Sequence, residues 1–174
     1  MKKFGIVVLS LLCIINLYAR DMAGKIGLGF GWDLSLMENG LMDSPPNVFS
    51  TKIGLGSKIV LEPVLGLDFL NEDGSNTMEI SFGAFLDYVL KSHPKTNLYF
   101  SGGIIFGSVN PPVGDAETTF GLLFGGGLEQ FISDNFSLDL TLRSGFLRVS
   151  EGDYSISDFY IGNEKVILRL CWYY

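Results

Sequence analysis

The sequence is poor in the residue types that most often carry chemistry. It holds 2 cysteines and 1 histidine. Cys13 lies in an N-terminal segment that we expect to be removed, so Cys171 is left without a cysteine partner. An intramolecular disulfide and a cysteine-based metal site are therefore excluded, and we predict neither a metal nor a cofactor.

Long apolar runs are missing after the first twenty residues, which argues against a membrane-spanning helix. The single such run, Phe4 to Leu17, follows Lys2 and Lys3 and ends just before Ala19. This pattern is typical of a secretory signal peptide cleaved after Ala19. We therefore expect a signal peptide at residues 1–19 and one exported domain at residues 20–174.

Basic residues are also scarce, because 12 Lys and Arg face 19 Asp and Glu. Loss of Lys2 and Lys3 with the signal peptide makes the mature chain more acidic still. Proteins that bind DNA or RNA need basic patches on their surface. The composition therefore excludes nucleic acid as a partner.

What the chain does have is glycine and a strict alternation of side chains, first visible in the stretch GKIGLGFGWDLSL, residues 24–36. Large apolar residues such as Ile26 and Phe30 occupy its even positions, and small or charged residues its odd positions. A phosphate-binding glycine loop would be followed by a helix. Here the alternation continues through Trp32, so the stretch predicts a β-strand.

The same alternation recurs seven more times, at residues 49–56, 61–69, 78–88, 98–107, 120–129, 136–143 and 165–174. Tight turns near Ser57, His93 and Asp134 alternate with longer connections at residues 38–47, 71–76, 109–117 and 149–158. Short turns at one end and longer loops at the other are typical of a membrane barrel. We predict an all-β fold, an eight-stranded antiparallel up-and-down transmembrane β-barrel.

The apolar face of this barrel is expected to point outward. The interior of an eight-stranded barrel is filled by about a dozen side chains, and the apolar face holds far more large residues than that. The other face carries glycine and serine where a soluble protein would carry lysine and glutamate. Lipid outside and a narrow polar lumen inside satisfy both faces.

Charged residues on the inward face are the first candidate site. They are Lys25, Asp33, Lys52, Glu62, Asp68, Glu79, Asp87, Glu129, Asp139, Arg143 and Arg169. Because buried charges are costly unless paired, we expect a plug of salt bridges in which Glu129 and Asp139 hold both arginines. The alternative is a charged constriction that selects solutes.

The inward glycines allow the same two interpretations. They permit sharply bent strands and give room for bulky inner residues such as Phe85, Tyr99 and Phe131. Alternatively, they leave a lumen wide enough for water or a ligand.

Two further sets of residues mark the membrane boundaries. Aromatic residues near strand ends are expected at the interfaces, namely Trp32, Tyr88, Trp172, Tyr173 and Tyr174. Acidic residues are expected in the outer loops, among them Glu72, Asp73, Asp115, Glu117, Glu151 and Asp153. These acids are either simply solvated, or hold divalent cations that bridge lipopolysaccharide, or bind a basic ligand.

The last alternation, Val166, Leu168, Leu170, Trp172 and Tyr174, resembles the terminal signal of small bacterial outer-membrane barrels. With the export signal and eight amphipathic strands, the whole mature chain resembles the OmpW and OmpX types, or the broader family called outer membrane protein β-barrel domain. The resemblance implies location in the outer membrane of a diderm bacterium, contact with its lipid and lipopolysaccharide, and insertion by the outer-membrane assembly machinery.

The resemblance also implies two alternative functions. The first is an OmpW-like passive conduit for small or hydrophobic solutes. The second is an OmpX-like structural or surface-interaction barrel with a plugged lumen and no transport.

Some small barrels modify lipid A with a histidine, a serine and often an acid. Here His93 is expected in a periplasmic turn, far from the outer leaflet, so no such set can form there. We expect no catalytic residues and no enzyme.

Overall fold

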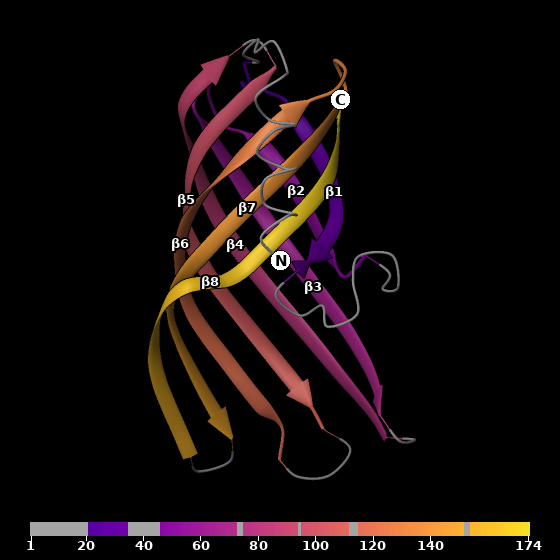
Figure 1. Ribbon diagram of the computed structural model, residues 1–174, viewed down its shortest axis with the longest axis vertical. Coiled ribbons are helices and arrows are strands. Elements are labelled where there is room, and N and C mark those ends of the chain that lie inside the picture. The colour runs from indigo at the N-terminus through magenta and orange to yellow at the C-terminus, as the bar shows by residue number, and fades with distance from the viewer. Residues whose placement is uncertain (1–20, 35–45, 73–74, 94, 112–114, 152–153) are drawn as a thin grey trace, which may run out of the picture.

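The computed structural model describes residues 21–34, 46–72, 75–93, 95–111, 115–151 and 154–174. Its strands are β1 (Ile26–Asp33), β2 (Val48–Gly54), β3 (Ile59–Glu72), β4 (Ser75–His93), β5 (Thr96–Asn110), β6 (Glu117–Phe131), β7 (Phe136–Glu151) and β8 (Tyr154–Tyr173). Consecutive strands pair antiparallel, and β1 also pairs with β8, which closes the sheet (Figure 1). The predicted eight-stranded antiparallel barrel is confirmed. No helix among the described residues is long and apolar enough to cross a membrane, and the predicted signal peptide lies outside the described ranges.

The barrel has two unlike ends. At the turn end, short connections join β2 to β3, β4 to β5 and β6 to β7, and the chain terminates there (top of Figure 1). At the hairpin end, β3–β4, β5–β6 and β7–β8 extend well beyond the short strands β1 and β2. The lengths make this plain, since β1 and β2 have 8 and 7 residues whereas β4 and β8 have 19 and 20.

Two of the long connections predicted at the hairpin end are wrong. β3 continues to Glu72 and β4 begins at Ser75, while β7 continues to Glu151 and β8 begins at Tyr154. Residues 71–76 are polar throughout, and the alternation at residues 154–157 lasts for only four positions, so the sequence signal is weak in these outer segments. Cross-strand hydrogen bonding continues nonetheless and keeps the backbone extended.

Two predicted boundaries also shift. β1 ends at Asp33, although the alternation continues to Leu36, which lies outside the described residues. His93 is the last residue of β4, paired with Thr96, rather than part of the turn.

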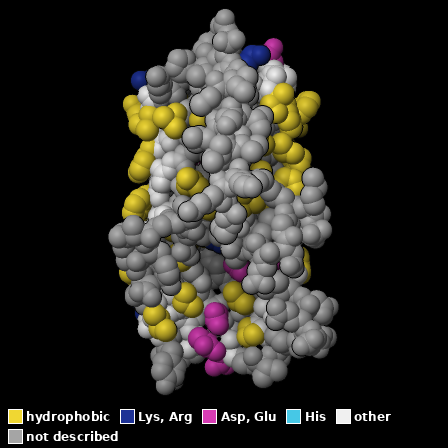
Figure 2. Space-filling view, viewed as in Figure 1, with side chains coloured by type: hydrophobic (Ala, Val, Ile, Leu, Met, Phe, Trp, Pro, Cys, Tyr) yellow, Lys and Arg dark blue, Asp and Glu magenta, His cyan; other side chains and the backbone are white. Residues whose placement is uncertain are grey.

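The outward face is apolar around the barrel, as the alternation predicts. Phe82 is 60 % exposed and Leu86 54 %, and hydrophobic side chains lie along both flanks in Figure 2. Exposed positions include Ile26, Leu28, Phe30, Phe49, Phe100, Ile104, Phe106, Leu122, Phe124 and Leu142. Such a surface is unfavourable in water and favourable in hydrocarbon.

The aromatic residues near strand ends divide between the two faces. Tyr88, Trp172 and Tyr174 are exposed on the outward side, and Trp32 is half-buried near the end of β1. Tyr173, expected at the interface, is instead 1 % exposed. Its odd position in the alternation of β8 turns it into the lumen, where it packs against Phe131 with ring centroids 5.6 Å apart.

Several inward glycines provide space for aromatic rings. A Cβ atom at Gly127 would collide with the ring of Tyr99, and one at Gly103 with the ring of Phe85. These two rings therefore cover glycines as predicted, and Tyr173 does the same over Gly27. The space that the missing side chains leave is filled rather than open.

Candidate functional site

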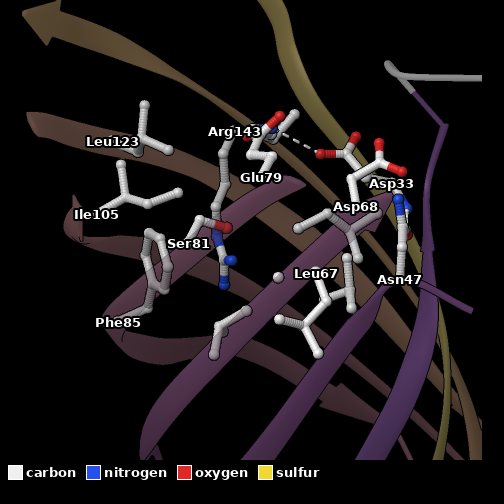
Figure 3. Close-up of a pocket in the computed structure, with 15 residues that line it drawn as sticks. Asp33, Asn47, Leu67, Asp68, Glu79, Ser81, Phe85, Ile105, Leu123 and Arg143 are labelled. Carbon is white, nitrogen blue, oxygen red and sulfur yellow. Dashed lines mark hydrogen bonds and ion pairs between the residues drawn. The ribbon is translucent and has the colours of Figure 1, made fainter. Parts of the chain in front are cut away.

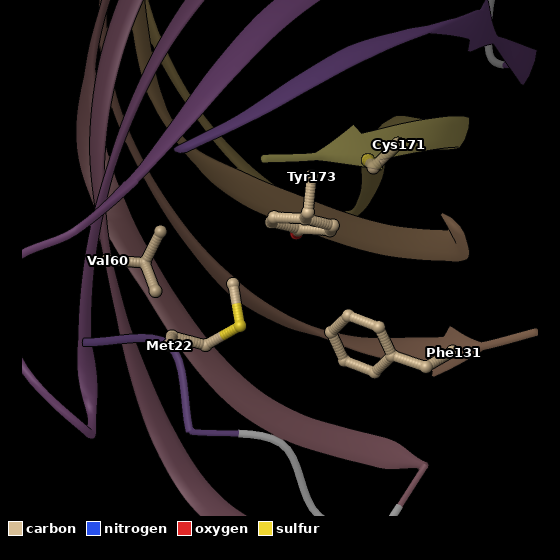
Figure 4. Packing of buried hydrophobic residues seen from close by; sticks show 5 residues of the cluster. All are labelled: Met22, Val60, Phe131, Cys171 and Tyr173. Atoms are coloured by element: carbon tan, nitrogen blue, oxygen red, sulfur yellow. The ribbon is translucent and has the colours of Figure 1, made fainter. Parts of the chain in front are cut away.

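An apolar cluster closes the lumen at the turn end. It consists of Met22, Val60, Phe131, Cys171 and Tyr173 (Figure 4). Met22 precedes β1, and a tight turn directs it inward, with the Lys25 amide donating to the Met22 carbonyl at 3.0 Å. Gly24 in that turn has a φ of 69°, a conformation that glycine adopts at little cost, and its amide donates to Gly54.

Cys171 offers a direct test of this packing, since its side chain has no exposed area. We expect the folded barrel to resist a membrane-permeant maleimide, and the urea-unfolded chain to react completely, because thiol reactivity requires access. Mass spectrometry after timed labelling measures the modified fraction. Rapid modification of folded protein would contradict the buried position.

Charged residues fill the lumen next to this cluster, on its side toward the hairpin end. We call the set Lys52, Glu62, Asp87, Glu129, Asp139, Arg143 and Arg169 the charged plug; each member is at most 3 % exposed. They come from β2, β3, β4, β6, β7 and β8, so the plug connects opposite walls. Burial of so many charges is tolerable because most of them pair closely with one another. Asp87 is the exception, since its carboxylate accepts no hydrogen bond from the described residues and lies 4.0 Å from Arg143 Nη2.

Asp139 is the centre of one half of the plug. Its carboxylate accepts hydrogen bonds from Lys52 Nζ at 2.7 Å, Arg169 Nη2 at 2.6 Å and the Tyr99 hydroxyl at 2.7 Å. Lys52 Nζ also lies 3.3 Å from Glu129 Oε2. One carboxylate on β7 thus holds side chains from β2, β5 and β8.

Glu62 is the centre of the other half. It pairs with Arg169, and Arg143 Nη2 donates to Glu62 Oε2 at 2.7 Å. The Arg143 guanidinium stacks 3.5 Å above the Phe85 ring centroid, and its Nε donates to Ser101 at 3.2 Å. The plug is therefore continuous from β3 to β7 and β8.

This pairing corrects part of the prediction. Asp139 does hold Arg169, but Arg143 is held by Glu62, and Glu129 pairs with Lys52. Residues four apart on one strand are separated by about 13 Å, so Arg143 reaches across the lumen to β3 rather than along its own strand to Asp139.

Hydroxyl groups complete the plug, and sequence reasoning did not select them. Tyr99 bonds to Asp139 and Thr141, whereas Glu129 accepts from Ser137 at 2.7 Å and from Tyr173. All of them occupy inward positions of the alternation. Their positions in the alternation therefore indicated that these side chains point into the lumen, but did not indicate which residues they would bond.

The remaining predicted lumen charges lie outside the plug. Asp33, Asp68 and Glu79 line a cavity of about 40 Å³ on the hairpin side (Figure 3). Asp33 pairs with Lys165 at 2.8 Å, and Lys25 lies half-buried before β1. A cavity of this size holds a few water molecules and no larger solute.

The predicted loop acids are mostly not in loops. Glu72 ends β3, Glu117 begins β6 and Glu151 ends β7, while Asp115 is exposed just before β6. Asp73 and Asp153 lie outside the described residues. No group of three His, Cys, Asp or Glu suited to a metal ion occurs within the described ranges.

Comparison with protein-family models and with curated proteins gives no match. Solved structures that match include the crystal structure of Ail, the attachment invasion locus protein of Yersinia pestis. That match has 12 % identity and a TM-score of 0.49, and it covers 88 % of this chain and 100 % of Ail. A backbone structure of the Yersinia pestis outer membrane protein Ail in a phospholipid bilayer nanodisc matches at 14 % identity and a TM-score of 0.49, covering 87 % of this chain and 99 % of that one.

The closed ring of eight antiparallel strands confirms the resemblance to small outer-membrane barrels at the level of fold. The finer prediction of an OmpW type stays a prediction.

Proposed function

We propose that this protein is a closed outer-membrane barrel that presents its long hairpins at the cell surface and does not transport solutes. The observation that carries the proposal is the charged plug, whose ion pairs connect β2 and β3 with β7 and β8 across the lumen. The apolar cluster at the turn end and the filled space over the glycines support the same function. The geometry favours this OmpX-like alternative over an OmpW-like conduit.

Membrane placement is supported by the apolar outward face, because lipid is the environment that such a face requires. In the proposed orientation the turn end and both mature termini face the periplasm. Contact with lipopolysaccharide and recognition of β8 by the assembly machinery belong to the proposal as expected partners. A cleaved signal peptide would deliver the chain there.

Surface display is supported by strand length. A tilted strand crosses a bilayer with about 9–11 residues, whereas β4 has 19 and β8 has 20. The excess lies at the hairpin end, where acidic side chains gather in Figure 2. These hairpins would form the surface for a partner, and we propose no enzymatic activity for the barrel.

Bilayer conductance tests the closed lumen. We expect refolded protein to give no current above that of protein-free bilayers, because the plug leaves no continuous water path. The double variant Phe85→Ala/Arg143→Ala removes the stacked ring and guanidinium, and it is still expected not to conduct, because the Asp139 half of the plug and the apolar cluster remain. A porin of known conductance in the same bilayers shows that the assay detects an open barrel.

Heat-modifiable migration on a denaturing gel verifies that each protein is folded before measurement. Steady single-channel currents from the folded wild type, or uptake of small sugars into liposomes carrying it, would contradict the closed-barrel function.

A further inference from the structure

The outward face carries one exception to its apolar character. Arg148 on β7 points outward and is exposed. It is the single charged residue among the described side chains at outward positions of β1 to β7. Its neighbours across the sheet are Phe120 on β6 and Ser157 on β8. A charge on a face built for lipid needs a specific explanation.

Arg148 borders a shallow hollow of about 420 Å³ over β5, β6 and β7. Phe106 and Phe120 form its aromatic side, with ring centroids 5.0 Å apart. Thr118 and Ser150 line it one position nearer the hairpin end. The hollow thus passes from apolar to polar in the direction of the cell surface.

The chemistry of this hollow fits an anionic headgroup. No carboxylate among the described side chains pairs with Arg148, so its guanidinium can bind a ligand. That group matches phosphate oxygens with two parallel hydrogen bonds, and the Ser150 hydroxyl adds a donor beside it. The Thr118 hydroxyl donates to the Ser150 carbonyl at a long 3.5 Å and can turn to a phosphate oxygen instead. The two phenylalanine rings provide a surface for an acyl chain.

We propose that this hollow binds a phosphorylated glycolipid of the outer leaflet, of the lipid A class. The phosphomonoester contacts Arg148, Thr118 and Ser150, and an acyl chain lies over Phe106 and Phe120. Charge complementarity supports this occupant, because the arginine is a positive group at the polar margin of an apolar wall. The inference rests on the proposed orientation, with the hairpin end outward.

The test measures lipid binding to folded protein in zwitterionic micelles. Titration with bisphosphorylated lipid A, followed by ³¹P NMR and native mass spectrometry, gives the affinity. We expect Arg148→Ala to weaken binding about tenfold, as expected for loss of one charge-assisted contact. Arg148→Lys should weaken it less, since a point charge remains without the planar fork. Lys58→Ala, an equal charge change at the exposed turn end, should leave it unchanged.

Two further ligands separate the headgroup from the chain. Lipid A without phosphate and inorganic phosphate alone are both expected to bind far more weakly than the complete lipid. Equal affinity of Arg148→Ala and wild type would overturn the site, as would equal binding of the dephosphorylated lipid or of free phosphate. Conductance is measured without this lipid, so failure here leaves the closed-barrel function standing, and failure there leaves the site standing.

Discussion

Arg169→Met is expected to destabilise the barrel by about 3–5 kcal/mol, because it removes one cation from a buried network and leaves an uncompensated negative charge there. Arg169 pairs with both Asp139 and Glu62 and has no exposed area. Methionine fills part of the volume but supplies neither charge nor hydrogen-bond donors. Urea unfolding in lipid vesicles, followed by gel mobility, measures the change in unfolding free energy.

Two variants sharpen this result. Arg169→Lys keeps the charge but loses the fork that bonds two carboxylates, so an intermediate loss is expected. Lys58→Met removes a positive charge from an exposed turn and should leave the unfolding free energy close to that of wild type. Equal stability of Arg169→Met and Lys58→Met would show that the plug contributes little to the folded state.

Gly127→Val is expected to cost about 3 kcal/mol, through overpacking and loss of buried hydrogen bonds. A Cβ atom at this position would collide with Tyr99 and lie 2.7 Å from the Leu140 carbonyl oxygen. The Tyr99 ring would have to move, and its hydroxyl would leave Asp139, to which it donates at 2.7 Å. The same urea titration measures the loss.

Gly102→Val is the matched control on the outward face. A Cβ atom there meets only Phe100 among neighbouring atoms within 4 Å, at 3.9 Å. Valine also suits a strand better than glycine does, so stability should be unchanged or raised. If both valine variants are equally tolerated, the inward glycines are not required to seat aromatic rings.

The sequence predicts the barrel well because each strand repeats one physical rule. Alternation places Ile26 outward and Glu62 inward without knowledge of any contact, and phase-breaking residues such as Phe85 still fall on the correct face. Strand ends at the hairpin side were predicted less well. At the end of the β3–β4 hairpin both faces are polar, so Glu72 and Ser75 carry no alternation signal, and only cross-strand pairing determines their conformation.

The sequence predicted which charged residues lie in the lumen, but only some of their ion pairs. The inward charges were identified from the alternation, but the choice of Glu62 for Arg143 depends on which strands face each other across the lumen. Barrel closure and the stagger of the strands set that distance, and one sequence contains neither. Tyr173 shows the converse, since its position in the alternation indicated an inward side chain while its terminal location suggested an interface.

The pairing of Arg169 has a consequence for assembly. Its partners Glu62 and Asp139 lie on β3 and β7, so the chain must complete β8 before each of these carboxylates gains the arginine as its further partner. An open sheet of seven strands would leave both acids with one partner fewer and would expose free backbone edges to hydrocarbon. Partly inserted forms are thereby penalised twice, and barrel closure and charge neutralisation become a single cooperative step. Pairing of β8 therefore favours the fully inserted, closed barrel over partly inserted forms.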